Sequence, residues 1–76
     1  MKNTKKEVGQ RVRDLRGSLT QQQVADVLKM DRGNFSKCEL GIHEFNYDML
    51  IALANYFNTS TDYILGLTIH TDPAPK

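Results

Sequence analysis

Residues Leu19–Gly41 read LTQQQVADVLKMDRGNFSKCELG, and this stretch decides the fold. Thr20 is a good helix N-cap, and Gln23 stands three residues later, which is the spacing of a capping box. A second start signal follows at Asp31, and Gly41 is suited to end the helix that begins there. The stretch therefore predicts two short helices joined by a tight turn.

The second of these segments is ambiguous, because Gly33 and Asn34 are poor helix formers and are common in turns. We nevertheless expect a helix over about 31–40, with Phe35 and Cys38 three residues apart on its buried side. Packing of Phe35 can offset the roughly 1 kcal/mol of propensity that the glycine loses. The opposite side is then polar and cationic, and consists of Arg32, Gly33, Ser36 and Lys37.

Periodicity predicts helices on both sides of this pair and no strands. Apolar residues at positions 8, 12 and 15 indicate a helix from about residue 4 to residue 16. Further helices are expected from the cap Asn46 to Phe57, and from the cap Ser60 to Gly66. The predicted fold class is all-α, with five short helices. One domain is expected over residues 1–68, followed by a flexible tail over 69–76.

Charge is distributed unevenly along the 76 residues, although the net charge is only +1. Residues 1–37 hold nine basic and four acidic side chains, a net charge of +5. Residues 38–76 hold one basic and five acidic side chains, a net charge of −4. Such asymmetry is typical of a chain whose basic half faces a polyanion.

Several functional classes are disfavoured by what the sequence contains. No run of 18 apolar residues is present, so no membrane span is expected, and no apolar segment follows the basic N-terminus as in a secretory signal. Cys38 is the single cysteine, which fits the cytoplasm and a buried apolar role. His43 and His70 lack partners at metal-ligand spacing. We expect no catalytic residues, no metal, no cofactor and no small-molecule ligand.

The ordered set of motifs resembles the Cro/phage-repressor type of helix-turn-helix regulators, also called the xenobiotic-response-element type. The matching segments are VGQRVRDLR, LTQQQVADVLKMDRGNFSKCELG and LIALANYFNTSTDYILGLT, which together cover about residues 7–67. This resemblance implies a lambda-repressor-like domain in which the helix around 31–40 reads the major groove of an operator. It also implies double-stranded DNA as a partner, and a homodimer or a heteromeric complex with another regulator.

The resemblance assigns roles residue by residue. Gln21 matches a glutamine that holds a DNA phosphate, and Glu39 matches a buried acid that pairs with an arginine, here Arg16. The expected DNA-binding residues of this type are Gln21, Arg32, Gly33, Asn34, Ser36 and Lys37. Weaker candidates for contacts with the DNA backbone are Gln22, His43 and Asn46.

The sequence departs from the family pattern in three places, and the last of them, together with the net charge of −4 over residues 38–76, leaves a second function open. The connection before Leu19 is about two residues short, and Lys29 stands where a turn glycine is common. That turn must hold a lysine at positive φ or be built differently. Ile42 and Phe45 replace the basic grip of the following loop, and they either pack on the core or bind another protein. The alternative is an anti-repressor, repressor modulator or antitoxin-like partner acting through the region after Gly41.

Overall fold

Every helix of the computed structural model, which describes residues 4–72, begins at a side chain that caps it. The helices are α1 (Lys5–Arg16), α2 (Gln21–Val27), α3 (Arg32–Glu39), α4 (Tyr47–Tyr56) and α5 (Thr61–Leu65). Their N-caps are Thr4, Thr20, Asp31, Asn46 and Ser60, and each side-chain oxygen accepts from a backbone N–H three residues on. No strand occurs within residues 4–72, so the all-α prediction is confirmed.

Helices α2 to α5 end in the same way, through one residue at positive φ. These residues are Lys29, Gly41, Asn58 and Gly66, with φ of 56°, 81°, 55° and 81°. In each case the next N–H donates to a carbonyl five residues back, as in Met30 N to Ala25 O at 3.0 Å, which is the Schellman motif. Of the two alternatives for this turn, a lysine at positive φ or a different backbone, the structure therefore shows Lys29 at positive φ.

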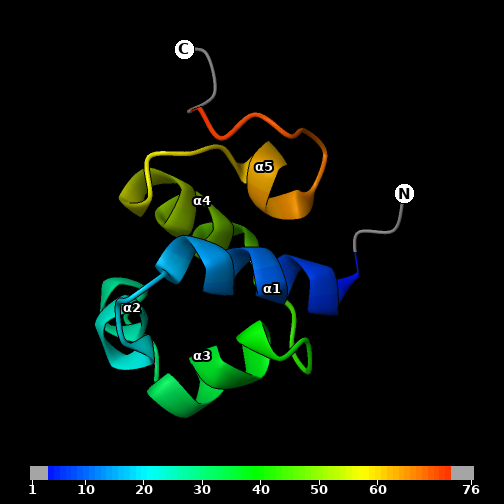
Figure 1. Cartoon of the computed structure of the whole chain (residues 1–76). Helices are drawn as coiled ribbons and strands as arrows, with labels where there is room; N and C mark the ends of the chain where they lie inside the picture. The colour runs from blue at the N-terminus through cyan, green and yellow to red at the C-terminus, as the bar shows by residue number, and fades with distance from the viewer. Residues whose placement is uncertain (1–3, 73–76) are drawn as a thin grey trace.

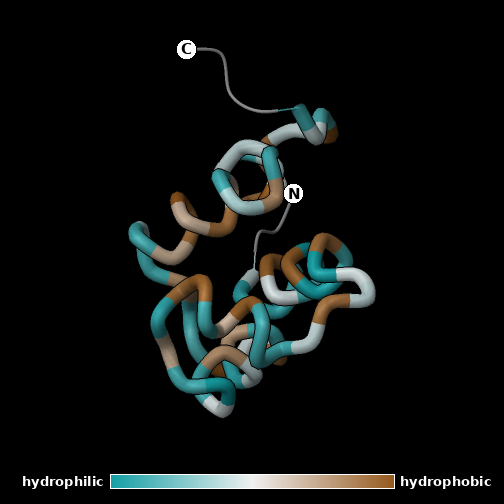
Figure 2. Tube along the Cα trace, turned by 90° about the vertical axis from the view of Figure 1, so that its left-hand side faces the viewer, coloured by the Kyte–Doolittle hydropathy of each residue, from teal (hydrophilic) through white to brown (hydrophobic). Residues whose placement is uncertain are grey.

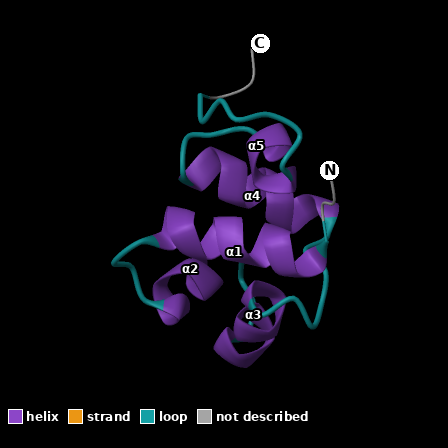
Figure 3. Cartoon of the chain, turned by 45° about the vertical axis from the view of Figure 1, so that its right-hand side comes forward, coloured by secondary structure: helices purple, strands orange, loops and turns teal. Residues whose placement is uncertain are grey.

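Helix α1 lies between two helix pairs (Figures 1 and 3). It contacts α3 on one side and α5 on the other, while α2 packs on α3 and α4 packs on α5. Fully buried side chains from each of these layers meet in one core, and the largest are Phe35, Leu53, Ile64, Val12 and Val24. The α2–α3 pair is thus held by α1 on one side and is open to solvent on the other.

The approach of α1 to α3 depends on Gly9. A Cβ built on this residue would overlap the backbone carbonyl oxygen of Glu39, and would lie 2.7 Å from that of Cys38. Any side chain at this position would push α1 away from the C-terminal end of α3. Gly9 is therefore a packing residue of the helix-turn-helix scaffold, a role that the sequence pattern does not indicate.

Hydrophobic and hydrophilic residues alternate along the trace (Figure 2). Among residues 4–72 no helix is long and apolar enough to cross a bilayer. Residues 69–72 are exposed and carry no helix, and 73–76 lie outside the described residues. The flexible tail over 69–76 and the domain boundary at 68 stay predictions.

Candidate nucleic-acid interface

Helix α3 has one buried and one solvent-facing side. Phe35, Cys38 and Glu39 are 0%, 3% and 3% exposed, and they face α1 and the core. Arg32, Asn34 and Lys37 are exposed, whereas Gly33 and Ser36 are partly buried. The structure thus brings five of the six predicted DNA-binding residues onto one short helix, and the sixth, Gln21, begins the helix that packs against it.

The N-terminus of α3 is helical and capped despite Gly33 and Asn34. Asp31 caps the helix by accepting a hydrogen bond from the backbone N–H of Asn34 at 3.3 Å. A Cβ on Gly33 would lie 2.8 Å from the capping carboxylate of Asp31, so the glycine leaves room for this cap. The segment that read as either helix or loop is therefore a helix with a strong start signal.

Of the two alternatives for Phe45, packing on the core or binding another protein, the structure shows packing on the core. It is only 9% exposed and packs edge-to-face on Phe35, with ring centroids 6.2 Å apart. Its ring fills the core beneath α3, because burial of an aromatic side chain is strongly favoured where a complementary ring is available. Ile42 stays 56% exposed. One of the two apolar residues assigned to a partner surface is therefore part of the hydrophobic core.

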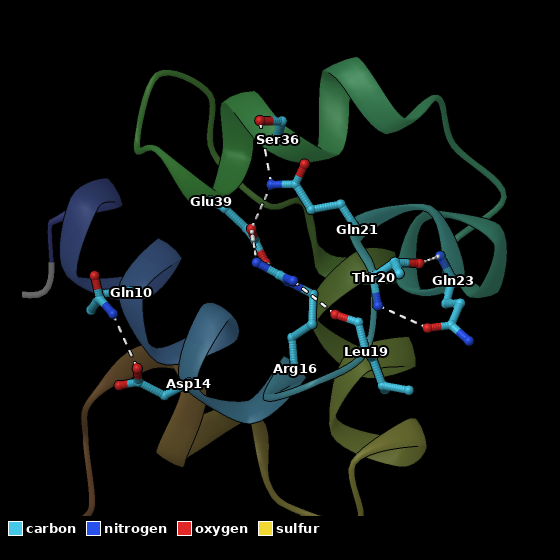
Figure 4. A network of polar contacts seen from close by, with 9 residues as sticks. All are labelled: Gln10, Asp14, Arg16, Leu19, Thr20, Gln21, Gln23, Ser36 and Glu39. Carbon is cyan, nitrogen blue, oxygen red and sulfur yellow. Dashed lines mark hydrogen bonds and ion pairs between the residues drawn. The ribbon is translucent and has the colours of Figure 1, made fainter.

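A buried ion pair ties α1 to α3 (Figure 4). Arg16 Nε donates to Glu39 Oε2 at 2.7 Å and Arg16 Nη2 donates to Oε1 at 3.1 Å, with the carboxylate side chain fully buried. The remaining guanidinium nitrogen donates to the carbonyl oxygen of Leu19 at 2.8 Å. One arginine thus satisfies the buried carboxylate and fixes the short connection before α2, as a buried charge requires.

Gln21 joins this network from the first turn of α2. Its Nε2 donates to Glu39 Oε1 at 2.9 Å and to Ser36 Oγ at 3.4 Å (Figure 4). The family resemblance matches Gln21 to a phosphate-holding position and does not predict its contacts with α3. No sequence signal reveals them, because residues 15 and 18 positions apart meet only when α2 crosses α3.

The weaker candidates for DNA contacts are exposed, but two of them have partners within the protein. Gln22 Nε2 donates to Asp26 Oδ1 at 2.7 Å along α2. Asn46 Oδ1 accepts from the N–H of Met49 at 2.9 Å and so caps α4. His43 is exposed in the loop after α3. Their engagement by DNA stays a prediction.

Cys38 is buried, as predicted for a small apolar residue. Burial raises the pKa of its thiol, because the uncharged form is preferred away from water. The neutral thiol is a poor nucleophile. Within residues 4–72 no group of three or more His, Cys, Asp or Glu side chains is placed to hold a metal ion.

Comparisons with known proteins agree with this geometry. A family model described as a helix-turn-helix domain matches residues 7–63. The uncharacterized HTH-type transcriptional regulator YobD of Bacillus subtilis (strain 168) is 38% identical over 69 residues, covering 88% of this chain and 60% of the relative. The HTH-type transcriptional regulator ImmR of the same organism is 34% identical over 61 residues, covering 78% of this chain and 48% of the relative.

The chain therefore spans about half of each of these relatives' length. No solved structure matches it. The family model covers all of α2 and α3 together with most of α1, all of α4 and part of α5. By this match, and by the pair of helices α2 and α3 joined by a tight turn, the chain belongs to the helix-turn-helix domain family of the phage-repressor type.

Proposed function

We propose that the protein is a sequence-specific DNA-binding transcriptional regulator of repressor kind, which inserts α3 into the major groove of an operator. The observation that carries this proposal is the exposed side of α3, with Arg32 and Lys37 as cations and no apolar residue before Leu40. A helix of this width fits the major groove, where base edges present distinct donors and acceptors. Its relatives bear the name of HTH-type transcriptional regulators.

Each exposed residue of α3 has a proposed role. Arg32, in the first turn, carries the planar donor pair that recognises guanine O6 and N7. Lys37 follows five residues later in the helix and supplies a cation for a phosphate or a base edge. Asn34 offers both a donor and an acceptor, and Gly33 lets the helix backbone come close to the DNA.

Two copies would bind together. A symmetric dimer places one recognition helix in each half-site, with half-site centres about 34 Å apart along the duplex. We infer that an inverted repeat with this spacing is the target, bound by a homodimer or by a heteromer with a related regulator. The cytoplasm is the proposed location, since bacterial DNA lies there and both relatives are bacterial.

The test begins with selection of duplexes from a random-sequence pool, followed by binding titrations at several salt concentrations. Arg32→Ala with Lys37→Ala is expected to lower affinity for the selected duplex by at least about tenfold, since one good base contact contributes roughly 1–3 kcal/mol. The logarithm of affinity should also fall less steeply with the logarithm of salt concentration.

Arg32→Lys is the matched control, because it keeps the charge and removes the planar donor pair. This variant should keep the salt dependence and lose preference at one base pair of each half-site. Unchanged affinity and unchanged salt dependence in the double alanine variant would show that α3 does not read DNA. The burial of Phe45 weakens the rival proposal of a partner surface on the loop after α3.

A further inference from the structure

In the polar network beneath α3, each hydrogen bond has a defined donor and a defined acceptor. Arg16 and Gln21 both donate to the Glu39 carboxylate, and Gln21 also donates to the hydroxyl oxygen of Ser36. A carboxylate accepts hydrogen bonds and donates none. The buried Glu39 carboxylate therefore fixes Gln21 as a donor. Gln21 in turn makes the Ser36 hydroxyl oxygen, at the surface of α3, an acceptor.

The orientation of the Gln21 amide follows from this order. Its Nε2 lies 2.9 Å from Glu39 Oε1, and turning the amide over would place its oxygen against a carboxylate oxygen. Two acceptors at that distance repel each other, so the N–H₂ group must face Glu39. Both hydrogens of this group then have acceptors, Glu39 and Ser36. Neither is left for a phosphate.

The Ser36 hydroxyl is oriented in turn. Its oxygen receives an N–H from Gln21 at 3.4 Å, and an amide nitrogen cannot accept in return. Helical serines commonly donate to a carbonyl of the preceding turn, but among residues 4–72 the Ser36 hydroxyl donates to no acceptor. Ser36 is partly exposed on the side of α3 that faces solvent. Its hydrogen is thus free to point outward.

We propose that Ser36 is a specificity-determining hydrogen-bond donor to an acceptor on a base edge, and that Gln21 is the positioning residue that fixes its polarity. The acceptors available in the major groove are purine N7, guanine O6 and thymine O4. The amino groups of cytosine and adenine are donors and are rejected by an oriented hydroxyl hydrogen. This inference rests on the proposed DNA-binding function.

Two consequences distinguish this arrangement from a phosphate contact by Gln21. Removing the Gln21 amide frees the Ser36 hydroxyl to donate or to accept, so discrimination at one base pair should weaken. Removing a phosphate contact instead lowers affinity equally for all sequences and reduces the salt dependence.

The experiment uses the full chain and a duplex selected from a random pool, with every single base-pair substitution and a scrambled duplex beside it. Ser36→Ala should bind the selected duplex about fivefold to tenfold more weakly, the effect of one hydrogen bond. It should lose its preference at one base pair of each half-site. Ser36→Thr keeps the hydroxyl and should keep the preference, and 7-deazapurine at a contacted purine N7 should weaken the wild type but not Ser36→Ala.

Gln21→Leu should lose preference at the same base pair, with unchanged affinity for the scrambled duplex and unchanged salt dependence. Adding Ser36→Ala to it should cause no further loss of base-pair preference, because the two residues determine that preference together. Equal weakening by Ser36→Ala on all duplexes would overturn the base-edge contact. Weaker salt dependence in Gln21→Leu would overturn the positioning role.

If Gln21→Leu fails to fold, the Ser36 variants still test whether Ser36 contacts a base edge. A wild-type protein that selects no sequence would overturn the proposed function itself. Selection of a sequence without any base-pair effect of Ser36→Ala would overturn this inference alone.

Discussion

The side-chain hydroxyl groups of two threonines, Thr20 and Thr59, have opposite effects on the stability of this chain. Thr20 Oγ1 accepts from the N–H of Gln23 at 3.1 Å and caps α2 at an exposed position. Thr59 is 6% exposed, and its Oγ1 is buried without a hydrogen-bond partner among residues 4–72. A buried hydroxyl in that state has lost its bonds to water and gained none.

Thr59→Val is therefore expected to raise the free energy of unfolding by about 1 kcal/mol, since valine has nearly the same shape and no hydroxyl. The backbone N–H of residue 59, which donates to Ala54 O at 2.8 Å, is retained. Urea denaturation followed by circular dichroism measures the change. Thr20→Val is the matched variant and should lower the same quantity by about 1 kcal/mol. A loss of stability in Thr59→Val would show that its hydroxyl has a partner in solution.

At the level of the elements, the turn between α2 and α3 carries strain at Lys29. Its φ of 56° lies in the left-handed region, which costs a residue with a Cβ roughly 1–2 kcal/mol. The two Schellman hydrogen bonds, Lys29 N to Asp26 O and Met30 N to Ala25 O, compensate by satisfying the last carbonyls of α2. The turn keeps its geometry without the glycine usual at this place.

Lys29→Gly is expected to stabilise the protein by about 0.5 kcal/mol, the relief of strain less the added freedom of the unfolded chain. The midpoint of thermal unfolding should rise by a few degrees. Lys29→Ala keeps the strain and removes the same charge, so it should give no gain. Equal stability of the two variants would mean that the turn can relax away from positive φ.

The elements also show how far sequence reasoning reaches. All five helices were predicted from apolar spacing and caps, because signals such as Thr20 with Gln23 act over one turn of chain. The placement of Gly9 against the carbonyl of Glu39 was not predicted, because it depends on how α1 crosses α3. Ile42 and Phe45 were equivalent in sequence, and only the position of the Phe35 ring separates the buried residue from the exposed one.

On the scale of the whole molecule, the excess of positive charge lies mainly on α1 and the excess of negative charge on the segments after α3. The basic half of the sequence, with net charge +5 over residues 1–37, forms α1, α2 and most of α3. The acidic half, with net charge −4, forms the end of α3, the next loop, α4 and α5. Of the acids in this half, Asp62 lies on α5, across α1 from α3 (Figure 3). Glu39 ends α3, Glu44 lies in the loop after it, and Asp48 lines a pocket together with Lys29 of the α2–α3 turn.

Glu44 is the acid of the loop directly after α3, and it is exposed. Glu44→Lys is expected to strengthen binding to any duplex and to steepen the salt dependence, by a slope of about 0.9 for each phosphate gained. Asp62→Lys, on α5, makes the same charge change across the molecule and should alter neither quantity. Titration of a scrambled duplex at 50 and 200 mM salt, on the order of the range where counterion release dominates, measures both. Equal effects of the two variants would show that overall charge, not its placement, governs binding.

The division of α3 into a buried and an exposed side has a consequence for how such proteins diversify. Folding depends on Phe35, Cys38 and Glu39, whereas Arg32, Asn34 and Lys37 touch little of the scaffold and are free to vary. Under the proposed function, new target sequences can therefore evolve by exchange of these exposed residues while the domain keeps its stability. Ser36 is the exception, since its contact with Gln21 makes the two positions a coupled pair that must change together.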